Sequence, residues 1–243
     1  PLRSNFNLTS LIDGNWTSGQ NGHAILNCIK HDFTNILIDE DPQKNEFIWN
    51  KLWWASHYGG RGGPTSMAIS AVDIAIWDAI GKYLNMPTCK AMGGAHRKSV
   101  ALYNGIGGTE PEEVADQAEW SVSKGYKFVK MHLKENLEKD IEIARKVRER
   151  VGDSVGIMID VHMGFDTFNV IKLGKELEKL NLLWIESPSD PTDIPGLCEI
   201  SRSLDIPIAN GEWTRTKYEM REIFEKRAYD ISMPDIARPG LTG

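Results

Sequence analysis

Three carboxylates recur at a fixed interval in the sequence, and their spacing suggests a shared chemical task. Glu186 follows Asp160 by 26 residues, and Glu212 follows Glu186 by another 26. The three acids lie in the segments MIDVH, WIESP and NGEWT. Glu186 ends an unbroken apolar run, residues 182–185, of the kind that forms a buried strand. An isolated buried carboxylate is costly, so such an acid should pair with a cation, bind a metal or face a water-filled site.

Basic and imidazole side chains accompany these acids. Lys130 and His132 stand two residues apart in KFVKMHL, so in a strand both would point to the same face. His162 follows Asp160 by two residues and shares its orientation, and Asp235 ends the segment SMPD, where it could orient a histidine. Each has a plainer interpretation, in which the lysine and histidines are exposed to solvent or only satisfy a backbone group.

These residues lie at or near the ends of short apolar runs, which alternate with amphipathic stretches from about residue 98 onward. The alternation is typical of successive βα units and a parallel sheet. The six expected strands span residues 99–105, 127–133, 155–161, 181–187, 206–212 and 229–235. The first two helices between them are expected over residues 111–125 and 136–153.

Convergence of the three acids favours a metal site. In a parallel barrel all strand C-termini open onto one face, so Asp160, Glu186 and Glu212 should meet there. Three neighbouring carboxylates repel one another unless a cation lies between them, and an all-oxygen set suits a hard divalent ion, magnesium before zinc. A single acid at a strand end is more often a helix N-cap or a solvated loop residue. Three at equal spacing on consecutive strands predict metal ligands.

The first 97 residues lack this alternation and predict a separate helical cap. One helix should follow Pro42, and a longer one lies within residues 63–87. The apolar positions of the longer helix recur at three and four residues, at Ile69, Val72, Ile76 and Ile80. Between the two helices the glycine-rich segment 56–65 suits a mobile lid, in which Arg61 could contact a substrate carboxylate or hydroxyls. An ordinary flexible connector is the alternative.

Composition excludes several classes of protein. The net charge of -6, from 28 basic and 34 acidic residues, leaves no positive excess to neutralise nucleic acid phosphates. Three scattered cysteines argue against a disulfide scaffold or a thiolate zinc site and favour a cytoplasmic location. No apolar run approaches the roughly 20 residues that span a bilayer, so no membrane partner is expected.

The ordered series Lys130-x-His132, Asp160, Glu186, Glu212 and Asp235 resembles the mandelate racemase/muconate lactonizing enzyme family of the enolase superfamily, and within it the acid-sugar dehydratases. The segment AISAVDIAIWDAIGKYLNMPTCKAMGG, ahead of the first strand, adds to the resemblance, which covers about residues 35 to 243. The resemblance implies an α/β fold. Residues 98–243 would form the first six strands of a modified TIM-type (β/α) barrel, and residues 1–97 part of an N-terminal α+β capping domain.

The resemblance also implies a function. Asp160, Glu186 and Glu212 would bind Mg²⁺, and the protein would be a lyase that dehydrates a sugar acid (an aldonate) to its 2-keto-3-deoxy acid. Such chemistry begins with removal of the proton α to the carboxylate and passes through a metal-stabilised enediolate. Lys130 would stabilise the enediolate, and His162 would protonate the departing 3-hydroxyl.

The chain departs from the family pattern at two places, and the first of them affects the assignment of the base. Many relatives have Lys-x-Lys where this chain has Lys130-Met131-His132, and Glu-Glu-Pro is replaced by Glu186-Ser187-Pro188. The base would be His132, or a histidine on a seventh strand that Asp235 would support. Neither that strand nor an eighth one precedes Gly243, so we expect these residues to belong to a longer protein.

Two alternative functions stay open. A racemase or epimerase of a 2-hydroxy acid on the same scaffold would exchange the C2 proton without forming a keto acid. A non-catalytic barrel fragment would bind magnesium without turning over any sugar acid.

The expected partners are a small-molecule sugar acid and, by the resemblance, further copies of the chain in a homo-oligomer.

Overall fold

The computed structural model describes residues 18–133 and 136–243, which form two compact units. The first unit contains the described chain up to Lys98 together with Thr214–Met220 and Asp235–Gly243. The second unit contains Ser99–Trp213 and Arg221–Pro234. The predicted division into residues 1–97 and 98–243 stays a prediction, because two later segments group with the first unit and residues 1–17 lie outside the described part.

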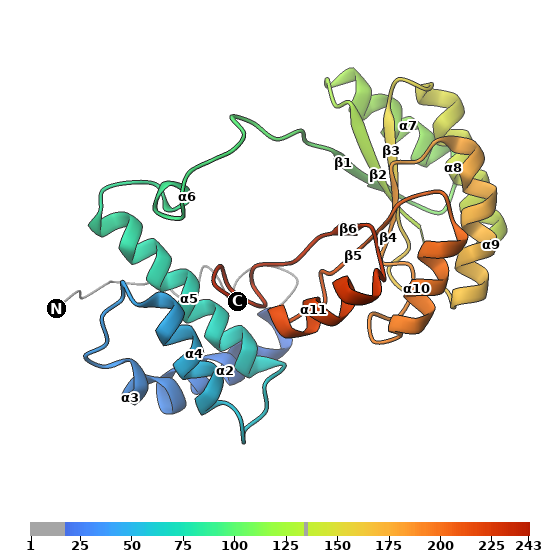
Figure 1. Cartoon of the computed structure of the whole chain (residues 1–243). Coiled ribbons are helices and arrows are strands. Elements are labelled where there is room, and N and C mark those ends of the chain that lie inside the picture. Colours follow the sequence, from blue (N-terminus) through green and yellow to red (C-terminus); the bar gives the residue numbers. More distant parts are fainter. Residues whose placement is uncertain (1–17, 134–135) are drawn as a thin grey trace. The chain divides into compact units, whose positions relative to one another are not determined.

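The second unit contains a six-stranded parallel sheet in which the strand order follows the chain order, β1-β2-β3-β4-β5-β6. The strands are β1 (Asn104–Gly107), β2 (Phe128–His132), β3 (Gly156–Asp160), β4 (Trp184–Glu186), β5 (Ile208–Asn210) and β6 (Ile231–Ser232). Figure 1 shows the intervening helices α7 to α10 along one face of the sheet. Sequential parallel strands with helices on one face are the winding of a (β/α) barrel, so the expected α/β fold class is confirmed.

In the described part of the chain, five helices belong wholly or partly to the second unit, and capping residues bound α8 at both ends. They are α7 (Pro111–Ser123), α8 (Leu137–Val151), α9 (Thr167–Leu177), α10 (Ile194–Ser203) and the part of α11 (Lys217–Lys226) from Arg221 onward, with a 3₁₀ turn, η2, at Glu178–Leu180. The Asn136 side chain accepts a hydrogen bond from the Lys139 N–H at 2.8 Å and so caps the start of α8. Gly152, with φ of 70°, ends the same helix.

Side-chain alternation divides each strand between two environments. Val129 and Met131 in β2 are fully buried, and Lys130 and His132 point to the opposite face. The register then continues across the sheet: His132 pairs with Asp160 in β3, and Asp160 pairs with Glu186 in β4. The parallel register therefore places three of the predicted site residues next to one another.

The first strand differs most from its expected range. It was expected over residues 99–105, whereas β1 begins at Asn104 and runs to Gly107. Val100 and Leu102, which belong to the apolar run expected to form this strand, are 71% and 68% exposed. Apolar residues without a packing partner do not hold a strand in a sheet, so only the Gly-containing end pairs with β2.

The described part of the first unit before residue 99 is helical. Its elements are α2 (Ser18–Asn27), the π-helix η1 (Cys28–Phe33), α3 (Thr34–Leu37), α4 (Asn45–Ala55), α5 (Pro64–Tyr83) and α6 (Thr88–Ala91). The two helices expected in this region correspond to α4 and α5. Ile69 and Val72, on the predicted apolar face of α5, belong to a buried core with Trp49 and Leu52 of α4.

A buried aspartate in α5 binds the segment Asp235–Gly243. The Asp73 carboxylate accepts hydrogen bonds from the backbone N–H groups of Leu241 at 2.7 Å and Thr242 at 2.9 Å, and from the Thr242 hydroxyl at 2.6 Å. The Trp49 indole donates to the Pro239 carbonyl at 3.1 Å. These bonds join residues distant in the sequence within one unit.

No helix in the described ranges is both long and apolar enough to cross a membrane.

Candidate functional site

The carboxyl ends of β2, β3 and β4 bring together a buried lysine and two buried acids. Lys130, Asp160 and Glu186 are 7%, 2% and 4% exposed. The Lys130 ammonium donates to both oxygens of Glu186 at 2.9 Å and lies 3.6 Å from Asp160 Oδ2. The ammonium thus serves as the cation that two neighbouring buried carboxylates require.

The environment shifts the pKa values of Lys130 and Asp160 in directions that favour their charged forms. Burial by itself acts to lower the pKa of Lys130, but the hydrogen bond and charge of Glu186 outweigh it and raise that pKa. Burial likewise acts to raise the pKa of Asp160, and hydrogen bonds from His132 and the His162 backbone bring it below its ordinary value. Both shifts favour the charged forms, an ammonium at Lys130 and a carboxylate at Asp160.

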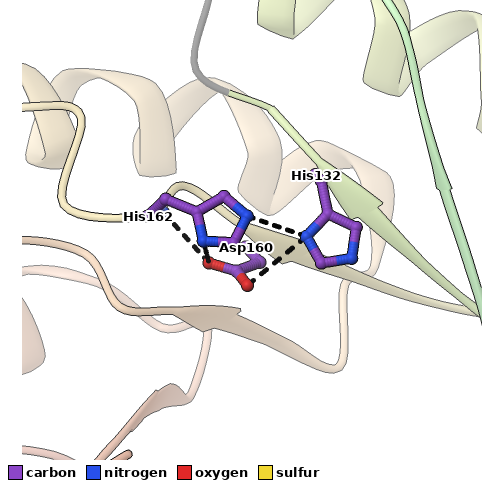
Figure 2. A group of neighbouring side chains, drawn as sticks. All are labelled: His132, Asp160 and His162. Carbon is purple, nitrogen blue, oxygen red and sulfur yellow. Dashed lines mark hydrogen bonds and ion pairs between the residues drawn. The ribbon is translucent and has the colours of Figure 1, made fainter. Parts of the chain in front are cut away.

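Two histidines lie beside Asp160 and form a direct hydrogen bond. His132 Nδ1 is 2.9 Å from His162 Nε2 and 3.5 Å from Asp160 Oδ2. His162 Nδ1 is 3.3 Å from Asp160 Oδ1, so the carboxylate contacts both rings (Figure 2). The rings are nearly parallel, with an interplanar angle of 10° and centroids 5.0 Å apart. Both predicted imidazoles therefore meet on one carboxylate.

A strained turn after β3 positions the His162 ring beside His132. His162 and Met163 have φ values of 47° and 59°, in the left-handed region that favours glycine. The turn is held because the His162 N–H donates to Asp160 Oδ1 at 3.0 Å and the Met163 N–H donates to the Ser187 carbonyl at 2.8 Å. Backbone strain of this kind persists where surrounding bonds fix it, often at functional sites.

The third predicted ligand, Glu212, lies two residues beyond the end of β5 and is half-buried. Its Oε1 accepts a hydrogen bond from the Ser187 hydroxyl at 3.3 Å. Ser187 is fully buried, follows Glu186 directly and has a φ of 47°. A serine thus connects the second and third acids where many relatives are expected to have a further acid.

Among the described residues, the group whose metal-binding atoms all lie within 4.8 Å of one another is His132, Asp160 and His162. The three acids Asp160, Glu186 and Glu212 do not form a second such group in that part of the chain. Their chemistry still suits magnesium, because they are oxygen donors from consecutive strands and a cationic group, the Lys130 ammonium, already contacts two of them. The donor set fits a hard divalent ion.

Two predicted site residues belong to the first unit. Asp235 Oδ1 accepts a hydrogen bond from the Ala237 N–H at 2.9 Å, and Oδ2 lies 3.9 Å from Arg238 Nε. The Arg61 guanidinium contacts His57 and lies 5.3 Å from the centroid of the Trp53 ring. The structure does not place either residue relative to the three strand ends, so their roles stay predictions.

Sequence reasoning missed two contacts of the array. The Lys130 ammonium lies 5.3 Å from the centroid of the Tyr103 ring, a cation–π distance, and Ser187 contacts Glu212. Tyr103 directly precedes β1 and carried no polar signal. Ser187 did carry one, because a small polar residue follows the strand-end acid directly.

Comparison with known protein families gives two matches. Residues 113–243 match the family described as "Enolase C-terminal domain-like". Residues 12–93 match the "Mandelate racemase / muconate lactonizing enzyme, N-terminal domain". The two matches follow each other in the order expected for a cap and a barrel.

Similar proteins include enzymes of different classes. The chain is 36% identical to L-talarate/galactarate dehydratase of Salmonella typhimurium over 86% of its own length and 53% of the relative's. It is 33% identical to 3,6-anhydro-alpha-L-galactonate cycloisomerase of Streptomyces coelicolor, over 93% and 63%. A crystal structure of a racemase from Streptomyces coelicolor with bound magnesium is 32% identical, with a TM-score of 0.83 over 90% of this chain and 62% of that one. The chain thus spans between half and two thirds of the length of these relatives.

Proposed function

The chain belongs to the mandelate racemase/muconate lactonizing enzyme family of the enolase superfamily, and on that premise we propose that it is part of a magnesium-dependent lyase that dehydrates a sugar acid to a 2-keto-3-deoxy acid. Relatives of comparable identity are a dehydratase and a cycloisomerase, and a similar structure is a racemase, so the family alone does not select the reaction. The observation that carries the proposal is the buried array of Lys130, Asp160 and Glu186 beside a hydrogen-bonded pair of imidazoles.

Asp160, Glu186 and Glu212 would hold the magnesium ion. The first two occupy paired positions on adjacent strands, and the third reaches them through Ser187. When bound, magnesium would hold the substrate carboxylate and stabilise the negative charge left after removal of the α-proton. The ion would compete with the Lys130 ammonium for Glu186, and the released ammonium could then face the substrate carboxylate.

The imidazole pair supplies the proton chemistry that dehydration requires. His132 would accept the proton from C2, and His162 would donate a proton to the 3-hydroxyl, which leaves as water. Because the two rings are hydrogen-bonded at 2.9 Å, a proton accepted by one can pass to the other. The resulting enol loses its 2-hydroxyl proton and gains a proton at C3, which gives the 2-keto acid, so the net change is loss of one water.

An acid at C3 favours dehydration over racemisation. A racemase needs a base on each face of C2, whereas His132 and His162 meet on the same carboxylate, Asp160. Asp235 could still support a further base, as the sequence predicts, and Arg61 could bind the substrate.

The proposal has three further parts. They are that the substrate is a sugar acid, that the protein forms a homo-oligomer, and that it is located in the cytoplasm.

A screen of sugar acids in the presence of Mg²⁺ tests the proposal, with 2-keto-3-deoxy acids detected by a carbonyl reagent. We expect keto product from at least one acid, and a loss of at least about 100-fold in the His162→Asn variant, the scale of general acid catalysis. The exposed His96→Asn variant is the matched control. Deuterium at C2 of recovered substrate without keto product would instead support a racemase or epimerase. Magnesium binding without turnover or exchange would support a non-catalytic role.

A further inference from the structure

We propose that His132, His162 and Asp160 form a second kind of metal site, which binds a transition ion such as Zn²⁺ through two imidazoles and one carboxylate. The magnesium ligands proposed above are oxygen donors, whereas this site has two nitrogen donors. Imidazole suits zinc, copper, cobalt and nickel, and magnesium prefers oxygen ligands. The two sites share Asp160 and differ in the ions they select.

The distances between the donor atoms agree with zinc coordination. Bonds of about 2.0 to 2.1 Å in a tetrahedral site place the donors about 3.3 Å apart. His132 Nδ1 lies 2.9 Å from His162 Nε2 and 3.5 Å from Asp160 Oδ2, and one donor from each residue lies within 4.8 Å of the other two. A separation of the two rings by about 0.4 Å would bring them to the zinc distance.

The surroundings of the site orient its ligands. Asp160 Oδ1 lies 3.3 Å from His162 Nδ1, and a proton on Nδ1 would leave Nε2 free for a metal. In the hydrogen bond between the rings, His132 Nδ1 would carry the proton and His162 Nε2 would accept it. On metal binding the proton of His132 would move from Nδ1 to Nε2 of the same ring. Each neutral ring would therefore keep its one proton. The His162 backbone N–H, 3.0 Å from the same Oδ1, fixes the carboxylate.

Access and charge also permit a cation. The side chains of His132 and His162 are 39% and 26% exposed, whereas that of Asp160 is 2% exposed, so an ion can reach the imidazoles from solvent. The Lys130 ammonium, 3.6 Å from Asp160, opposes a second cation, but Glu186 neutralises it with both oxygens at 2.9 Å. The remaining charge is negative and attracts a divalent ion.

The test is a calorimetric titration of the full chain with Zn²⁺ in the absence of Mg²⁺. We expect one equivalent to bind, with an affinity at least about tenfold lower in His132→Gln and in His162→Gln, because even outer-shell changes cost 10- to 100-fold. The double variant His31→Gln/His96→Gln, at two exposed histidines, should bind as the wild type does. Equal affinity in all four proteins, or loss only in the double variant, would overturn the proposal.

Pulsed EPR of the wild type with one equivalent of Cu²⁺ gives a readout that needs no variant. Modulation from the remote nitrogens of two imidazoles is expected, and its absence would contradict the site. The zinc titration does not depend on the proposed dehydration, so its failure and that of the proposed function are distinguishable. A further expectation, that Mg²⁺ competes with Zn²⁺, does rest on Asp160 as a magnesium ligand.

Discussion

At the scale of single residues, the decisive feature is a lysine ammonium held by buried carboxylates. Lys130 donates to both oxygens of Glu186 and lies 3.6 Å from Asp160. Buried ion pairs contribute little net stability, but removal of one partner leaves an uncompensated charge and costs about 3 to 5 kcal/mol. The buried carboxylates of Glu186 and Asp160 therefore need a neighbouring cation, which can be the lysine ammonium or a metal ion.

Replacement of this lysine should make the protein depend more strongly on magnesium. In Lys130→Met the two carboxylates lose their ammonium, so the melting temperature in EDTA should fall. Saturating Mg²⁺ should then raise it more than in the wild type, because the ion meets no competing cation. Thermal unfolding followed by circular dichroism, with and without Mg²⁺, measures both effects.

The matched control is Lys139→Met, which removes a partly exposed lysine that pairs with Glu110 at 3.0 Å. Such surface pairs are worth about 0 to 1 kcal/mol, so its response to Mg²⁺ should match the wild type. An equal magnesium-induced shift in Lys130→Met and in the wild type would contradict the competition.

The residue types and spacing could be read from the sequence, but several contacts could not. Acids at strand ends are predictable because parallel strands end at one edge, and the register indeed pairs Asp160 with Glu186. The hydrogen bond between His132 and His162 depends on left-handed backbone at His162 and Met163. Nothing in the local sequence predicts that conformation, because neither residue is glycine.

At the scale of elements, an internal arginine fixes the connections around α8. Arg148 is buried, and its guanidinium donates to the backbone carbonyls of Leu180, Gly152, Val155 and Asn181 at 2.9, 2.7, 2.8 and 3.1 Å. It therefore joins the end of α8 to the start of β3 and to the turn before β4. The strands that carry Asp160 and Glu186 both follow these connections.

Loss of this arginine should destabilise the second unit strongly. Arg148→Met leaves four carbonyls without their charged donor, and each hydrogen bond to a charged group is worth about 1.5 to 3 kcal/mol. We expect the free energy of unfolding to fall by at least about 3 kcal/mol, measured by urea denaturation. Arg145→Met, at an exposed pair with Glu176, should change it by about 0.5 kcal/mol or less. Similar losses in both variants would rule out this role for Arg148.

The elements themselves were largely predictable from apolar periodicity and capping residues. The helix expected over residues 136–153 is α8, between Asn136 and Gly152, because both caps are local signals. The predicted start of β1 was wrong by five residues, because the apolar character of Val100 and Leu102 does not reveal that both are exposed. Burial depends on neighbours that a single segment does not specify.

At the scale of the whole molecule, Asp73 shows how a distant segment becomes part of the first unit. This carboxylate accepts three hydrogen bonds from Leu241 and Thr242. Gly240, with φ of 83°, lies so close that an added Cβ would be 2.6 Å from Asp73 Oδ2. An acid on the buried face of this helix was a signal of such a partner, but the sequence did not identify it.

The pH dependence of stability should report on this contact. Burial raises the pKa of Asp73 above its ordinary value of 3.8, although the bonds from Thr242 and Leu241 oppose the change. A raised pKa means that the folded state favours the protonated form. The stabilising contribution is therefore complete below the ordinary value and is lost as the pH rises through the raised pKa.

Urea denaturation from about pH 4 to about pH 7 can measure this contribution, with Asp73→Asn as the variant that does not titrate. The wild-type free energy of unfolding minus that of the variant should decrease as the pH rises. Asp78→Asn, at an exposed acid on the same helix, should give a difference that does not decrease in this way. A wild-type minus Asp73→Asn difference that increases with pH would show that the hydrogen bonds outweigh burial.

The most direct test of the whole account is the affinity of the chain for Mg²⁺, measured by titration calorimetry. Asp160→Asn, Glu186→Gln and Glu212→Gln should each weaken binding by at least about tenfold, since even outer-shell changes cost that much. Glu176→Gln, at an exposed acid in α9, should bind as the wild type does. Wild-type affinity in all three site variants would contradict the shared magnesium site.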